Sequence, residues 1–202
     1  MMDSLPALVT ASISLNRKWR ELNSSAPKAS DISAIYASFH QDFHEENNRY
    51  KSSNWLADHL EYIFGKKIGS LFELITGNGR FARRAASKIE RVYAIDWAKV
   101  PSIGDLPPNV GFVQQDVAAG LLPHSDLVCS VDVFEHILPD GIEHVIETAF
   151  ASSRKQYHVI ACYDDSHSHF TVMPPSAWLA LFRHFDETCR LQHLETRRAD
   201  PR

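Results

Sequence analysis

The stretch Leu71-Phe-Glu-Leu-Ile-Thr-Gly-Asn-Gly-Arg-Phe81 has the clearest structural pattern in the sequence. Its apolar first half is typical of a buried strand, and two closely spaced glycines, Gly77 and Gly79, follow before helical spacing begins at Phe81. A glycine-rich turn lets the backbone approach a ligand closely, and the start of the next helix offers unpaired amides to a carboxylate or phosphate. The stretch therefore predicts a strand, a ligand-binding turn and a helix.

Short apolar runs bounded by turn residues recur after Lys67 and are typical of buried parallel strands. They cover residues 70–75, 91–95, 110–113, 127–131 and 157–162. Segments with helical spacing separate them, most clearly 81–89 and 141–152, so strand and helix alternate as βαβ units require. Right-handed crossovers then place helices on both faces of the sheet. We predict a doubly wound α/β domain over residues 67–202.

Residues 1–66 are predicted to form an N-terminal helical segment. Asp31 is suited to cap one helix, and Asn54 a second helix that repeats apolar residues on one face until Gly65 ends it. The first of these helices carries His40 and His44 one turn apart. It suits either a lid over a substrate or a helix that merely packs on the domain.

Two segments carry a resemblance to a known family. The stretch from Leu71 to Phe81 resembles the first motif of class I S-adenosylmethionine-dependent methyltransferases. The run Asp126-Leu-Val-Cys-Ser-Val-Asp-Val-Phe-Glu-His-Ile137 is similar to the family's segment ending in Asp-Val-Leu-Glu-His. The resemblance implies a Rossmann-like, mostly parallel sheet of six or seven strands and S-adenosyl-L-methionine as the cofactor. The sequence departs from the family at Ile75, where most members have the first of three glycines.

The resemblance also implies roles for the residues at the strand ends. Asp96 follows the second strand 17 positions after Gly79, close to the roughly 20-residue spacing of ribose-binding acids. We expect it to be an exposed carboxylate. Asp116 follows the third strand and is expected either at the adenine amino group or as a helix N-cap. The implied cofactor-binding set is Glu73 at the methionine amino group, Gly77, Gly79, Asp96, Asp116 and Asp132, with Glu135 and His136 bordering the sulfonium and the substrate.

Three histidines are candidates for catalysis. His136 ends the fourth-strand run, and His167 and His169 lie in the polar segment between Tyr163 and Trp178 that follows the fifth strand. A neutral imidazole accepts the proton of a hydroxyl near neutral pH, so a general base is expected among them. His167 and His169 have no obvious third ligand for zinc, so no metal site is predicted.

Composition limits the acceptor and the cellular location. The chain has 202 residues, of which 44% are hydrophobic and 23% charged, and a net charge of -4, with a pI near 6.2. This balance gives no basic face for nucleic acid, so a small molecule or a sugar of a glycan is the expected acceptor. Three widely spaced cysteines and the absence of an apolar run of about 20 residues favour a cytoplasmic protein without a membrane span.

Two alternatives stay open at this level. A protein that binds S-adenosylmethionine without transferring a methyl group would keep the same motifs. A nicotinamide-dependent oxidoreductase would use a similar glycine-rich turn before a helix, but its pattern has a third glycine, and Ala82 occupies that position here. The run through His136 favours the methyltransferase.

Overall fold

The computed structural model describes residues 34, 54–65, 67–98, 101–165 and 168–192. The helix expected after Asp31, with His40 and His44, therefore lies outside the described residues except for residue 34. The second expected helix is present as α3 (Asn54–Phe64), and Gly65 ends it with a φ of 64°. None of the helices in the described part of the chain combines the length and apolar character that a bilayer span requires.

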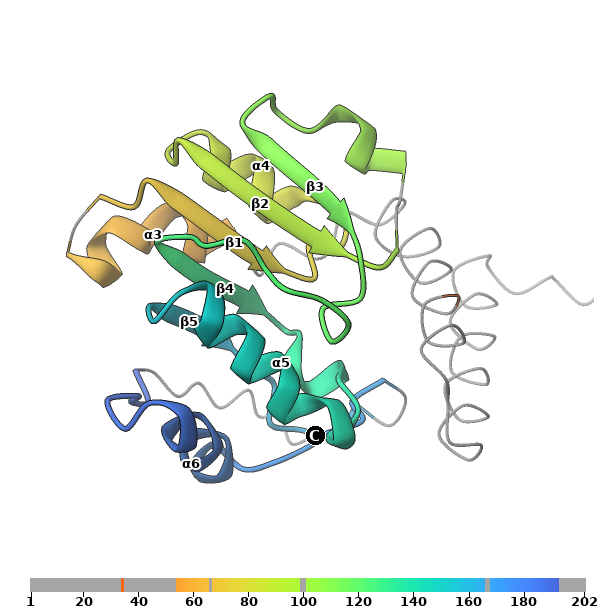
Figure 1. Cartoon of the computed structure of the whole chain (residues 1–202), viewed down its shortest axis with the longest axis vertical. Helices are drawn as coiled ribbons and strands as arrows, with labels where there is room; N and C mark the ends of the chain where they lie inside the picture. Colours follow the sequence, from red (N-terminus) through yellow and green to blue (C-terminus); the bar gives the residue numbers. More distant parts are fainter. Residues whose placement is uncertain (1–33, 35–53, 66, 99–100, 166–167, 193–202) are drawn as a thin grey trace, which may run out of the picture.

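A parallel sheet with the strand order β3-β2-β1-β4-β5 forms the centre of the molecule, and the strand arrows in Figure 1 run the same way. Its strands are β1 (Ser70–Leu74), β2 (Arg91–Asp96), β3 (Val110–Gln114), β4 (Leu127–Val131) and β5 (Gln156–Val159). The sheet thus has five strands within the described residues, fewer than the six or seven expected. Residues 186–192, which follow the last described helix, form turns and irregular structure.

The fifth strand is shorter than predicted. β5 ends at Val159 rather than at Cys162 because its only neighbour in the described sheet is β4, whose last residue, Val131, pairs with Val159. The remaining four predicted strands agree with the structure to within one residue at each end.

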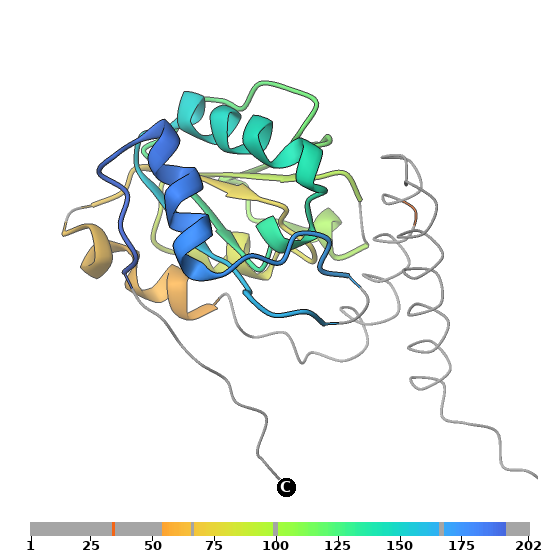
Figure 2. The same cartoon turned by 90° about the horizontal axis from the view of Figure 1, so that it is seen from below.

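Helices cover both faces of the sheet, which confirms the doubly wound prediction. Figure 2 shows α5 (Pro139–Ser152) and α3 on opposite sides of the sheet. α6 (Pro175–Phe185) shares a hydrophobic cluster with α5, and α4 (Arg80–Ala86) shares one with α3. α4 ends earlier than predicted, since the amides of Ser87 and Lys88 donate to carbonyls three residues back and tighten the last turn. Two short 3-10 helices, η2 (Pro101–Asp105) and η3 (Phe134–His136), lie in the connections.

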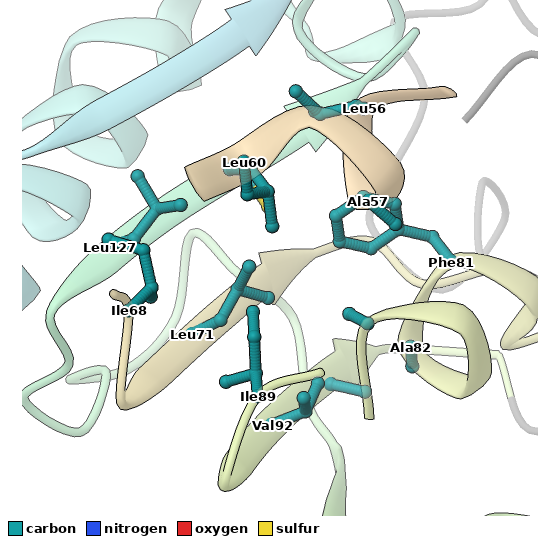
Figure 3. Close-up of a cluster of buried hydrophobic side chains, with 13 residues drawn as sticks. Leu56, Ala57, Leu60, Ile68, Leu71, Phe81, Ala82, Ile89, Val92 and Leu127 are labelled. Atoms are coloured by element: carbon teal, nitrogen blue, oxygen red, sulfur yellow. The ribbon is translucent and has the colours of Figure 1, made fainter. Parts of the chain in front are cut away.

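Two hydrophobic clusters hold the helices to the sheet, because successive side chains of a strand point to opposite faces. In Figure 3, Leu60 of α3 and Phe81 of α4 point toward Leu71 of β1, and all three side chains are buried. Leu56 of α3 is buried in the same cluster. On the other face, Phe72 of β1 belongs to a cluster with residues of α5 and α6, among them Ile146 and Phe182.

The carboxyl ends of the parallel strands share one rim of the sheet. β1 lies between β2 and β4, so the direction in which the chain adds strands reverses there. In open α/β sheets ligands bind outside the carboxyl ends at such a reversal. The residues that follow β1, β2 and β4 are therefore candidates for a ligand-binding site.

Candidate functional site

The turn after β1 is built on alternating left-handed residues. Ile75, Gly77 and Gly79 have φ angles of 54°, 55° and 73°. The Thr76 amide donates to the Ile95 carbonyl of β2 at 2.9 Å, and the Gly79 amide donates to the Thr76 carbonyl at 3.0 Å, which fixes the turn. Ile75 thus adopts the conformation usual for glycine although it is β-branched. The backbone at Ile75 is therefore left-handed although the residue is not glycine.

Space around the Cβ position of Gly79 is limited. A Cβ at this position would lie 3.0 Å from Leu106 Cδ2 and 3.1 Å from Ile103 Cδ1. Gly79 is the N-cap residue of α4, and its carbonyl accepts the Arg83 amide at 3.0 Å. A side chain here would be both strained and crowded, so the backbone of this turn is held close to its surroundings.

Glu73 lies inside the protein, at the end of β1. Its side chain is 7% exposed, and Thr76 Oγ1 donates a 2.6 Å hydrogen bond to its Oε2. Burial raises the pKa of Glu73 to about 8, and the nearby negative charge of Asp96 acts in the same direction. The carboxyl group is therefore neutral at pH 7 in the protein alone, and a cationic ligand group would favour its ionised form.

Asp96 corrects the expectation of an exposed carboxylate. It is 1% exposed, and its two oxygens accept the Gly77 amide at 2.8 Å and the Ala98 amide at 2.9 Å. Burial raises its pKa to about 6, against the opposing effect of these amides. Asp96 therefore joins the end of β2 to the glycine turn, a structural task that strand position alone does not reveal.

Asp116 and Asp132 follow β3 and β4. Asp116 Oδ1 accepts the Ala118 amide at 2.9 Å, and its carbonyl accepts the Ala119 amide, so it caps a turn. No helix follows directly, so Asp116 is not the helix N-cap of the alternative interpretation. Asp132 is exposed and left-handed, with a φ of 54°, a conformation that aspartate tolerates. Both therefore lie at the rim.

The connection after β4 places Glu135 inside the protein. Glu135 is 0% exposed, and its Oε1 accepts the Ala161 amide at 3.2 Å. Its Oε2 has no hydrogen-bond partner among the described residues. Burial raises the pKa of Glu135 to about 8, and the charges of Asp132 and Asp165 add to the effect. This burial was not foreseen from the sequence.

The structure brings His136 and His169 together, with ring centroids 4.8 Å apart in an edge-to-face arrangement. His136 Nδ1 lies 3.0 Å from the Ser168 carbonyl oxygen, and His169 Nδ1 lies 2.6 Å from the Tyr163 carbonyl oxygen. His136 is the last residue of η3. The third predicted histidine, His167, lies outside the described residues.

Sequence reasoning missed the residue that organises this segment. Asp165 Oδ1 accepts the amides of Ser168 and His169 at 2.8 and 3.0 Å, and the Ser168 hydroxyl donates to Oδ2. His169 Nε2 lies 3.8 Å from Asp165 Oδ2. The signal was an aspartate three residues before a serine in a polar segment, a pattern typical of side-chain-capped turns.

His158 is a further imidazole, partly buried in β5, whose contacts are with neighbouring core side chains. Its Nδ1 lies 2.9 Å from Ser130 Oγ and its Nε2 lies 2.8 Å from Gln156 Oε1. Its ring packs against Phe134 and Phe182. Burial lowers the pKa of His158 to about 3, so the ring is neutral and supports η3 from beneath.

Known proteins resemble this chain in fold but not in sequence. No protein-family model and no curated protein matches the sequence. A 1,6-didemethyltoxoflavin-N1-methyltransferase of Burkholderia thailandensis, solved with its substrate and S-adenosylhomocysteine, superposes with a TM-score of 0.62 at 15% identity, covering 76% of this chain and 75% of its own. The N-methyltransferase NodS of Bradyrhizobium japonicum, with S-adenosylhomocysteine, gives 0.58 at 12% identity over 76% and 85% of the chains. The plantazolicin methyltransferase BpumL gives 0.56 at 14% identity over 86% and 79%.

Proposed function

We propose, on the premise that this chain has the class I methyltransferase fold, that it transfers a methyl group from S-adenosyl-L-methionine to a small molecule or to a sugar of a glycan. The observation that carries the proposal is the turn after β1. There a buried acid, Glu73, and two left-handed glycines lie at the carboxyl end of the central strand. Structures with this fold hold S-adenosylhomocysteine, the product of the cofactor.

The residues at the rim fit the parts of the cofactor. Glu73 suits the methionine ammonium group, because a cation beside a buried carboxyl group stabilises its charged form. The backbone at Gly77 and Gly79 suits the carboxylate, since no side chain intervenes. Asp96 suits the ribose hydroxyls, because a carboxylate that accepts two amides retains further lone pairs. Asp116 suits the adenine, and Asp132 borders the sulfonium.

The acceptor belongs on the other side of the same rim. The sulfonium supplies an electrophilic methyl carbon and a thioether leaving group, so the protein contributes mainly by positioning the reactants. His136 and His169 lie on the segments that follow β4 and β5, and a neutral imidazole beside a hydroxyl acceptor would take the proton that the hydroxyl oxygen loses. His167 remains a candidate for the same role. The net charge of -4 supports a small or glycan acceptor over nucleic acid.

Calorimetry with the tag-free chain tests the proposal. We expect S-adenosylhomocysteine to bind with 1:1 stoichiometry and reduced nicotinamide dinucleotides not to bind. Gly79→Val should abolish the binding, whereas Gly104→Val, at a glycine with open space around its Cβ position, should retain it. Binding of the dinucleotide in place of S-adenosylhomocysteine would refute the proposal. Cofactor binding without methyl transfer to any acceptor of a hydroxyl and amine panel would indicate a non-catalytic binder.

A further inference from the structure

Three side chains of metal-ligand type meet beside the acceptor side of the rim. Glu135 and His136 come from η3, and His169 comes from the segment after β5. One ligand atom from each lies within 4.8 Å of the others. The histidines of the 163–178 segment alone lack a third ligand in the sequence. The fold supplies it from a part of the chain 34 positions earlier, because β4 and β5 are neighbours in the sheet.

The two imidazoles have the tautomer that a metal ligand needs. A carbonyl oxygen only accepts hydrogen bonds, so the Nδ1 atoms of His136 and His169 carry the hydrogens they share with Ser168 and Tyr163. In the neutral rings Nε2 then carries the lone pair. Metal-binding histidines are usually oriented in this way, with the second ring nitrogen donating to a backbone carbonyl or a carboxylate.

Glu135 gives the independent indication of a cation. It is fully buried, and its Oε2 has no hydrogen-bond partner in the part of the chain that the structure describes. A buried polar oxygen without a partner is costly and is rare in folded proteins. The negative charges of Asp132 and Asp165 act on Glu135, and Asp165 Oδ2 also lies 3.8 Å from His169 Nε2. A positive ion would satisfy both features.

We propose that Glu135, His136 and His169 bind a divalent transition-metal ion of the zinc class. Two imidazoles with one carboxylate are ligands of Zn²⁺ and Fe²⁺, whereas Mg²⁺ prefers oxygen ligands and water. Ligands at 2.0–2.1 Å from a tetrahedral zinc ion lie about 3.4 Å apart, so binding requires the side chains to close in from their present separation. Three protein ligands leave a position open for an oxygen of the acceptor. That last role rests on the proposed function, but the metal site itself does not. A histidine whose Nε2 binds the ion does not also act as the general base, so the two proposals assign His136 and His169 alternative roles.

Metal titration of the tag-free full chain tests the site without cofactor or acceptor. We expect one equivalent of Zn²⁺ to bind, Co²⁺ to give the visible absorption of a site with nitrogen and oxygen ligands, and excess Mg²⁺ not to compete. Glu135→Gln keeps an acceptor for the Ala161 amide but removes the charge. It should weaken Zn²⁺ binding at least about 100-fold, the upper range for loss of an outer-shell partner. His169→Gln should do the same, and His144→Ala, an exposed histidine of α5, should have no effect.

The outcomes are separable from those for the cofactor. Circular dichroism checks that each variant folds, and if Glu135→Gln does not, His169→Gln alone decides the result. The proposal would be overturned if the wild-type chain bound no Zn²⁺. It would also be overturned if the folded Glu135→Gln and His169→Gln variants bound Zn²⁺ with the wild-type affinity. S-adenosylhomocysteine affinity is measured in a separate titration, so failure of the methyltransferase proposal leaves the metal result intact.

Discussion

Replacing Ile75 by glycine and, separately, by alanine measures the free-energy cost of the left-handed backbone after β1. Ile75 is half-buried, packs against the cluster beneath α5 and α6, and has a φ of 54°. A left-handed conformation costs a residue with a Cβ roughly 1–2 kcal/mol, and glycine escapes this cost. Both substitutions remove the same packing beyond Cβ, so their difference isolates the backbone.

Ile137 provides the matched control. It is also half-buried and packs against the same cluster, but its φ is -85° and its ψ is 138°. At such a site glycine is less stable than alanine by roughly 0.5–1 kcal/mol, because glycine has more freedom to lose on folding. The same loss applies at position 75. At each position, the free energy of unfolding of the alanine variant is subtracted from that of the glycine variant. The difference at position 75 should exceed the difference at position 137 by about 1–2 kcal/mol, in favour of glycine.

Urea denaturation followed by circular dichroism measures the four free energies of unfolding. Additivity between separate sites holds to about 0.3–0.5 kcal/mol, so a double difference below about 0.5 kcal/mol would refute the strained backbone. A confirmed difference would mean that Ile75 holds a left-handed backbone at an energetic cost. Such strain is typical of functional sites.

Three further outcomes follow from the same rim. Gly79→Val should lower the free energy of unfolding by about 2–5 kcal/mol, because valine would be strained in the left-handed conformation and crowded against Leu106. Gly104→Val should lower it by about 1 kcal/mol or less, and urea titrations of both variants measure the difference. Asp96→Ala leaves two buried amides without an acceptor, at about 1–3 kcal/mol each, so it should be less stable than Asp96→Asn; equal stability would contradict the hydrogen bonds described. Glu73 has its folded pKa raised to about 8, so the stability it confers is full below pH 4.5 and is lost as the pH rises through 8. Glu73→Gln, which does not ionise, should therefore gain stability relative to the wild type over this window by up to about 1.4 kcal/mol per pH unit, and parallel pH profiles of the two proteins would contradict the raised pKa.

The strands and helices were largely predictable because burial imposes a period on the sequence. Apolar runs identified β1 to β4 to within one residue at each end, and the glycine at position 65 marked the end of α3. The end of β5 was not predictable, because it depends on where its neighbour β4 stops rather than on its own apolar residues.

Side-chain environments at the rim were less accessible to sequence reasoning. That Asp96 follows a strand was visible, but its burial depends on the amides of Gly77 and Ala98, which the turn and the next segment bring to it. The same holds for Glu135, which looks like a polar residue of a connecting turn. Its burial follows from contacts with the chain after β5, which no local pattern encodes.

The hydrogen bonds between η3 and the histidine segment also have a consequence for protein engineering. The Thr171 amide donates to the Glu135 carbonyl at 3.0 Å, and the Thr171 hydroxyl donates to the Ile137 carbonyl at 2.7 Å. These two hydrogen bonds hold the chain around Thr171 in a fixed position against the turn after β4. A graft of this region into another protein should therefore carry both segments together, because either one transplanted alone would lose the hydrogen bonds that set its position.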